Sequence, residues 1–280
     1  MQDDRTQKLL EEYRGIFQRE GNPAWAVDVN PSILFVGQGW VPGEGILVYA
    51  SAENLAGNYP NAEGTVLKTN PWDRHRAHFE EWKVDAQRSA FPSVHIQPVS
   101  DGPLQVVAAF VRTRAGLACP ADPALALELG AFANFAKFAI KSDGPNVDHA
   151  TDFEKLCASL PYVQADFETL EPRFVVLPRT MFDTLKWAVE RSLPGASQWA
   201  PLVNKLSLRA LPATQANQRA LNHLAKVEAI AAHALALEAR FRAEGAPWLE
   251  WVPRVRGVNE PTIWRLLAEI DLAAGGRFSR

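Results

Sequence analysis

Two polar side chains in this sequence stand where they can do chemistry. Asn134 is the one uncharged polar side chain in the mostly apolar run of residues 125–141, and its amide offers a hydrogen-bond donor beside an acceptor. Glu44 is the carboxylate of the glycine-rich stretch 37–45, and a carboxylate can polarise a water molecule or stabilise a developing positive charge. The alternatives are an amide that is satisfied within the core and a solvated loop acid.

The elements that must position these residues alternate between strands and helices. Apolar runs predict strands at 33–36, through Tyr49, and at 130–138, 173–178 and 205–210. Helical spacing and capping residues predict helices at 3–20, 76–90, 104–114, 151–171, 180–191, 216–244 and 261–274. This alternation predicts an α/β fold with three layers, α/β/α, around a mostly parallel sheet. The loops after Val36 and Ala210 are then expected beyond the carboxyl ends of the strands, where ligands bind.

The length of 280 residues, without an internal repeat or a long linker, favours a single domain over residues 1–280. Its core is expected at about 22–221, followed by a helical C-terminal extension at 222–280.

Composition excludes several classes of protein. The formal net charge of −3 excludes a chain-wide basic field, so any contact with DNA must be local. Two cysteines, Cys119 and Cys157, are too few for an all-thiolate metal site and favour free thiols in a reducing compartment. No apolar run is long enough to cross a membrane, and the polar start does not resemble a secretion signal. We therefore expect a cytoplasmic protein without a metal or other cofactor, and a monomer is favoured.

Three segments, in order, resemble motifs of the uracil-DNA glycosylase superfamily. The strand and loop at 33–45, ILFVGQGWVPGEG, resemble its first motif. Residues 131–185 resemble the stretch of the iron–sulfur-containing members that carries Asn134, Lys137, Cys157 and Pro172 in register. The segment 206–221, LSLRALPATQANQRAL, takes the place of the final strand and its minor-groove loop.

The sequence departs from the superfamily pattern at its chemical positions. The residue that positions the hydrolytic water in many members falls near Gly39 or Trp40, and the catalytic histidine position is Leu211. An iron–sulfur cluster needs four thiolates, and the sequence has two cysteines. A substrate other than uracil is therefore expected.

The resemblance implies a pocket for a flipped-out base. Asn134 would bind the Watson–Crick edge of the base and Glu44 would act on water or on the cationic sugar, so these two are the candidate catalytic residues. Base contacts are expected from Gln38, from stacking on Trp40 and Tyr49, and from a pocket widened at Gly39; for Tyr49, core packing is the alternative. Further polar candidates for a larger base are Glu53 and Asn54.

DNA binding would depend on local groups near the second and third segments. Leu211 is a candidate wedge in the base stack, with a plain core leucine as the alternative. The remaining candidates for DNA contact, which an ordinary solvated surface explains equally, are Lys137, Lys141, Arg209, Pro212, Thr214 and Arg219.

The function that follows from the resemblance is hydrolysis of an N-glycosidic bond in DNA to leave an abasic site. A divergent member of this kind is known to act in bacterial defence on glucosylated hydroxymethylcytosine of phage DNA, so a modified cytosine is the expected base. Two alternatives remain: a catalytically inactive DNA-binding module of the same fold, and an unrelated α/β enzyme such as a nucleotide hydrolase.

Overall fold

Four short apolar strands form the parallel centre of the sheet. The computed structural model describes residues 4–26, 31, 35–51, 102–141, 147–149, 152–214, 227–255 and 258–279. In this part of the chain the five-stranded sheet has the order β1-β3-β2-β6-β7. Strands β2 (Ile46–Ala50), β3 (Gly130–Asn134), β6 (Phe174–Pro178) and β7 (Ala210–Ala213) run parallel, whereas β1 (Phe35–Val36) pairs antiparallel with β3 at the edge.

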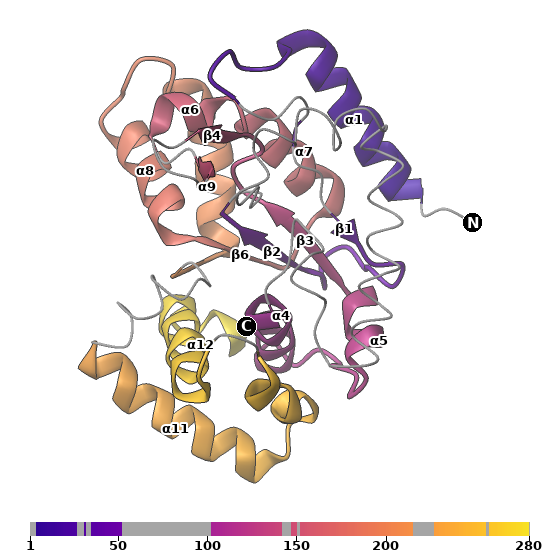
Figure 1. Cartoon of the computed structure of the whole chain (residues 1–280), viewed down its shortest axis with the longest axis vertical. Helices are drawn as coiled ribbons and strands as arrows, with labels where there is room; N and C mark the ends of the chain where they lie inside the picture. The colour runs from indigo at the N-terminus through magenta and orange to yellow at the C-terminus, as the bar shows by residue number, and fades with distance from the viewer. Residues whose placement is uncertain are drawn as a thin grey trace.

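Helices cover both faces of this sheet (Figure 1), which is the expected three-layer α/β/α architecture. One face packs against α1 (Asp4–Glu20), α6 (Phe153–Cys157), α7 (Leu160–Leu170), α8 (Arg179–Glu190) and α9 (Ala200–Arg209). The other face packs against α4 (Gly102–Arg114), α11 (Glu228–Glu244), the 3₁₀ segment η2 (Pro247–Arg254) and α12 (Glu260–Ala274). Alternate residues of each strand enter the two cores: Leu47 and Tyr49 lie on the first face, and Ile46 and Val48 on the second.

The C-terminal helices complete one layer of the core. Helix α12 packs on β7, and Phe278 of the last turn, η3 (Arg277–Ser279), contacts Phe174 of β6 with 5.2 Å between ring centroids. The predicted extension at 222–280 thus supplies much of the cover over the second face of the sheet.

The shorter elements join these layers. They are α5 (Pro123–Glu128), before β3; the hairpin of β4 (Ala139–Lys141) and β5 (Val147–His149); and η1 (Ser197–Trp199), before α9. None of the described helices is long and apolar enough to span a membrane.

Most predicted elements are confirmed within a few residues, including the helices at 3–20, 104–114, 180–191 and 261–274 and the strand at 173–178. The strand predicted at 130–138 ends at Asn134, and the helix predicted at 151–171 is divided into α6 and α7. The helix predicted at 76–90 lies outside the described residues, and of the one predicted at 216–244 the structure describes α11, from Glu228.

The strand predicted at 205–210 is wrong, because these residues continue helix α9 up to Arg209. Leu206 and Leu208 alternate in the sequence as strand residues do, yet Leu208 is 76% exposed. The buried side chains Leu202, Val203 and Leu206 follow helical spacing instead, and Pro201 stands at the helix start.

Glycines allow the loop at 37–45 to pack closely against the chain before β3. The amide of Gly37 donates to Gly130 O (2.9 Å) and that of Gly39 to Glu128 O (2.8 Å). A Cβ at Gly37 would lie 2.2 Å from the backbone oxygen of Glu128, and one at Gly45 would lie 2.3 Å from the Trp40 ring. The loop therefore needs glycine for close backbone packing.

We predict that Gly37→Ala lowers the free energy of unfolding by about 1–3 kcal/mol, because the backbone of Glu128 must move. The matched control is Gly15→Ala within α1, where the new Cβ meets only the far end of Arg19 at 3.5 Å. That change should raise the free energy of unfolding by about 0.5–1 kcal/mol through helix propensity. Urea unfolding followed by circular dichroism compares the two variants, and equal effects would contradict the packing account.

Candidate functional site

The carboxyl ends of the four parallel strands meet at one edge of the sheet, here called the carboxyl edge. Ala50 pairs in register with Asn134, and Pro178 with Ala213. Ligands of open α/β sheets bind beyond this edge. Since neighbouring strands lie about 4.8 Å apart, the four strand ends span roughly 14 Å.

Asn134 is the last residue of β3 and is fully buried at this edge. The backbone around it is fixed, because Phe135 N donates to Ala50 O (2.9 Å) and Ala136 N donates to Ser51 O (2.8 Å). The Ser51 hydroxyl is also buried and has no hydrogen-bond partner within the described part of the chain. The amide and the hydroxyl thus lie at the ends of adjacent strands, but the alternation of side chains places Asn134 on the face of Ala50 and Ser51 on the opposite face.

A second polar group at the carboxyl edge is built around Glu269 of α12. Its Oε1 accepts from Arg179 Nε (2.8 Å), and its Oε2 accepts from the backbone N–H of Thr214 (2.7 Å). Arg179 Nη2 also donates to Pro212 O (3.1 Å). The Arg179 side chain is 42% exposed while that of Glu269 is 7% exposed, so a fixed guanidinium faces solvent beside Thr214. Such a guanidinium is suited to binding a phosphate.

Arg179 and Glu269 were not predicted from the sequence as site residues. The signal for Glu269 was present, because it interrupts the apolar face of α12 at a position where burial demands a partner. Arg179 carried a weaker signal as the first residue after a buried strand.

Lys137 does not face DNA, and its prediction as a phosphate contact is wrong. Its side chain is fully buried, and Nζ binds Asp166 Oδ2 of α7 at 2.9 Å. The same carboxylate accepts from the hydroxyls of Tyr13 (2.5 Å) and Tyr49 (2.8 Å), and Lys137 Nζ lies 5.2 and 5.5 Å from the centres of those two rings. Tyr49 is therefore a core residue and not a stacking surface.

Burial shifts the titration of this cluster. Desolvation raises the pKa of Tyr13 and Tyr49 well above the usual value, and the nearby Asp166 charge acts in the same direction. Desolvation lowers the pKa of Lys137, although Asp166 opposes this shift. The two tyrosines are thus protonated donors to Asp166 at neutral pH.

The loop at 37–45 lies at the opposite edge, called the amino edge, so its predicted place beside Asn134 is wrong. Strand β1 runs antiparallel to β3, and the loop after it leads into the start of β2. The five residues of β2 separate Glu44 from the carboxyl edge by about 16 Å. Glu44 is exposed there and cannot act together with Asn134.

The other predicted base contacts of this loop fail for the same reason. Trp40 is 3% exposed, and its Nε1 donates to Leu170 O at 3.0 Å, so no base can stack on it. Gln38 is exposed, and its backbone N–H donates to Glu128 Oε2 (2.9 Å). The missing side chain at Gly39 admits the neighbouring backbone of Glu128 and does not widen a pocket.

The third predicted segment is split between the two edges. Leu211 is fully buried within β7, so the wedge role is wrong and the core alternative holds. Arg209 lies at the amino end of β7, where it donates to Pro172 O (2.7 Å) and covers the Phe167 ring. Pro212 and Thr214 do reach the carboxyl edge.

Four further candidates have limited or no description. Lys141 ends strand β4, and its side chain is not described. The other three, Glu53, Asn54 and Arg219, lie outside the described residues.

Within the described ranges, no group of three or more His, Cys, Asp or Glu residues is arranged to hold a metal ion. The two cysteines are free thiols. Burial raises the pKa of Cys119 to about 11 and also raises that of Cys157, so both are protonated at neutral pH.

We predict that Lys137→Met lowers the free energy of unfolding by about 3–5 kcal/mol, because it leaves the Asp166 carboxylate buried without its cation. The double variant Lys137→Met with Asp166→Asn should lose less free energy of unfolding than the sum of the losses in the two single variants. Urea unfolding of the four proteins measures this coupling. Additive effects would show that the two side chains do not depend on each other.

We predict that stability falls steeply above pH 10. Unfolded tyrosines lose their protons near this pH, whereas Tyr13 and Tyr49 keep theirs in the folded state. The folded state then binds more protons, so the free energy of unfolding falls by about 1.4 kcal/mol per pH unit for each tyrosine. Urea unfolding between pH 10.5 and 11.5 measures how the free energy of unfolding depends on pH. In Tyr49→Phe this dependence should be smaller by the contribution of one tyrosine. An unchanged slope would contradict the assignment.

Comparison of this chain with protein-family models, with curated proteins and with solved structures finds no match. The arrangement at the carboxyl edge is therefore the basis on which a function is assigned.

Proposed function

We propose that the protein is a DNA N-glycosylase that binds a flipped-out base at Asn134 and hydrolyses its glycosidic bond. The observation that carries this proposal is a buried amide at the carboxyl end of a parallel strand, fixed by backbone bonds to the adjacent strand end. An amide in that position has the donor and acceptor that read the edge of a pyrimidine. The resemblance of residues 131–185 to the uracil-DNA glycosylases supports the same role for Asn134.

The second polar group supports contact with a nucleic-acid backbone. The half-exposed Arg179 is fixed by Glu269 and Pro212 at the same edge as Asn134, two strands away. The Arg179 guanidinium reaches Pro212 of β7, three strand intervals or roughly 14 Å from β3, a separation that lets it meet a phosphate near a base held at Asn134. Thr214 extends this contact from the end of β7.

The residue that acts on water must differ from Glu44. In the sequence, Glu53 is the first carboxylate after β2, two positions beyond Ser51 at the carboxyl edge. In this proposal Glu53 keeps the role expected from the sequence, a polar contact to a base larger than uracil. The proposed substrate is DNA with a modified cytosine, and the proposed location is the cytoplasm.

One observation favours the second candidate, a DNA-binding module without catalysis. Among the described residues, the carboxylate found at this edge beside Thr214 is Glu269, which already accepts hydrogen bonds from Arg179 and Thr214. It is therefore occupied as a structural acceptor and is not free to activate water.

The test incubates the purified protein with three DNAs: unmodified, uracil-containing, and containing glucosylated hydroxymethylcytosine. Hot alkali then converts abasic sites to strand breaks. We expect breaks only in the modified DNA and a loss of roughly 100-fold in rate for Asn134→Ala. Glu44→Gln at the opposite edge is the comparison variant and should retain activity.

The remaining outcomes separate the candidates. Breaks made by Asn134→Ala at the wild-type rate would exclude the proposed base-binding role. No breaks in any DNA, together with a gel shift that Arg179→Gln weakens, would instead establish the non-catalytic module.

A further inference from the structure

A cationic cavity lies at the amino edge, on the side of the sheet covered by the C-terminal helices. It has a volume of ≈ 450 Å³. Its charged lining consists of Arg114 at the end of α4, Arg173 just before β6, and Arg240 and Glu244 on α11. Arg173 N donates to Gly45 O (2.9 Å), which fixes the cavity at the start of β2 and β6. The cavity is thus separate from the proposed base-binding edge.

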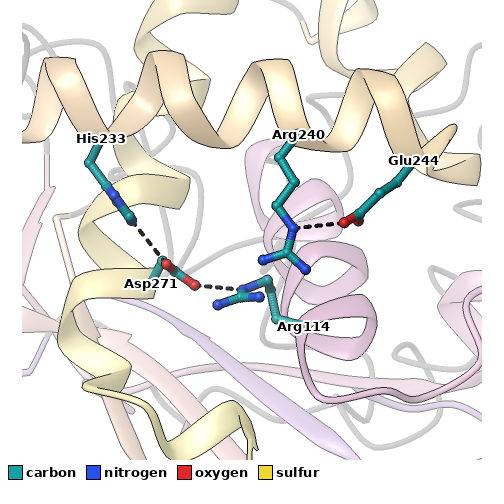
Figure 2. Close-up of polar contacts among 5 residues, drawn as sticks. All are labelled: Arg114, His233, Arg240, Glu244 and Asp271. Carbon is teal, nitrogen blue, oxygen red and sulfur yellow. Dashed lines mark hydrogen bonds and ion pairs between the residues drawn. The ribbon is translucent and has the colours of Figure 1, made fainter.

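The lining brings three arginines together with one carboxylate. Figure 2 shows Arg240 projecting from α11 beside Glu244, and Arg114 at the end of α4 directed toward Asp271. Arg240 Nε binds Glu244 Oε1 at 2.7 Å, on the same helix. Arg114 Nε binds Asp271 Oδ1 at 2.6 Å. The other oxygen of this carboxylate, Oδ2, lies 2.9 Å from His233 Nε2. Even with Glu244 and Asp271 counted, the three arginines leave an excess of positive formal charge, which favours binding of an anion.

Aromatic rings fix the three guanidinium groups. Arg114 lies 5.4 Å from the centre of Phe278, Arg173 lies 5.8 Å from Phe174, and Arg240 lies 5.8 Å from Phe241. These rings belong to one connected set. The ring centroid of Phe278 lies 5.2 Å from that of Phe174 and 6.5 Å from that of Phe110, and the centroids of Phe110 and Phe241 are 5.6 Å apart. The positive groups are therefore preorganised on a rigid aromatic base, which reduces the entropy lost when a ligand binds.

We propose that this cavity binds a small phosphorylated ligand of the size of pyrophosphate or a nucleoside diphosphate. Planar guanidinium groups bind phosphate oxygens in pairs, and the volume falls within the range of small-ligand sites. A DNA duplex fits less well, because the formal net charge of −3 gives the chain no overall basic field along which a duplex could lie. The proposal does not depend on the glycosylase activity.

The test is isothermal titration calorimetry of the full chain with pyrophosphate and, separately, with ADP at low ionic strength. We expect saturable binding at one site and a loss of affinity of about tenfold in Arg240→Gln, which removes one charge-assisted contact. Arg240 is half-exposed, so the variant should fold normally. The matched control is Arg242→Gln, on the same helix, where the arginine binds Glu238 and Glu260 and lies outside the cavity.

Three results would overturn the proposal. They are the absence of saturable binding of both probes, an equal loss of affinity in the Arg242→Gln control, and binding of only duplex DNA with a loss in Arg240→Gln. The last result would identify the arginines as a contact for the DNA backbone. Normal pyrophosphate binding in a protein that does not cleave DNA would leave this site intact and remove only the proposed glycosylase activity.

Discussion

The buried ion pair between Lys137 and Asp166 is the interaction on which the arrangement of the candidate site depends. One carboxylate accepts from Lys137, Tyr13 and Tyr49, so it connects the turn after β3 to α7, α1 and β2. Lys137 also donates its backbone N–H to Ser159 Oγ (2.8 Å), which fixes the same turn to the start of α7. Because Lys137 follows Asn134 by three residues, this network determines where β3 ends and where the Asn134 amide is held. A buried charge pair of this kind is strongly destabilising when broken, even where it adds little net stability itself.

The loop before β2 at the amino edge differs in composition from the strand ends at the carboxyl edge. At the amino edge before β2, close packing of backbone on backbone excludes side chains at Gly37 and Gly45, and buried Trp40 fills the space that remains. At the carboxyl edge the strand ends present polar groups, among them Asn134, Ser51 and the Arg179–Glu269 pair. A glycine-rich stretch near an apolar strand therefore has two physical explanations, ligand approach and chain packing, and here the observed contacts support packing.

The fold could be predicted from the sequence where burial follows local periodicity. Helix α1 and strand β6 are of this kind, because their apolar spacing matches the layer that they enter. The site was harder to predict, because direction and pairing are long-range properties. No local sequence pattern shows that β1 runs antiparallel to β3. Because it does, Glu44 lies at the amino edge and not at the carboxyl edge, where it was predicted. Likewise, the lysine at 137 is fully buried only because Asp166, far along the sequence, meets it in the core.

The order in which the chain is synthesised gives the C-terminal layer a further consequence. All described strands of the main sheet precede residue 214, whereas its second face is covered by α4, which precedes β3, and by α11, α12 and Phe278, which follow β7. During translation the second face of the sheet therefore lacks part of its final cover, over Leu211 of β7 in particular, until α12 has been made. Exposed apolar surface of this kind favours aggregation and chaperone binding. Arg277, whose Nη2 donates to Ala210 O (2.7 Å), then completes the attachment of the last turn to β7.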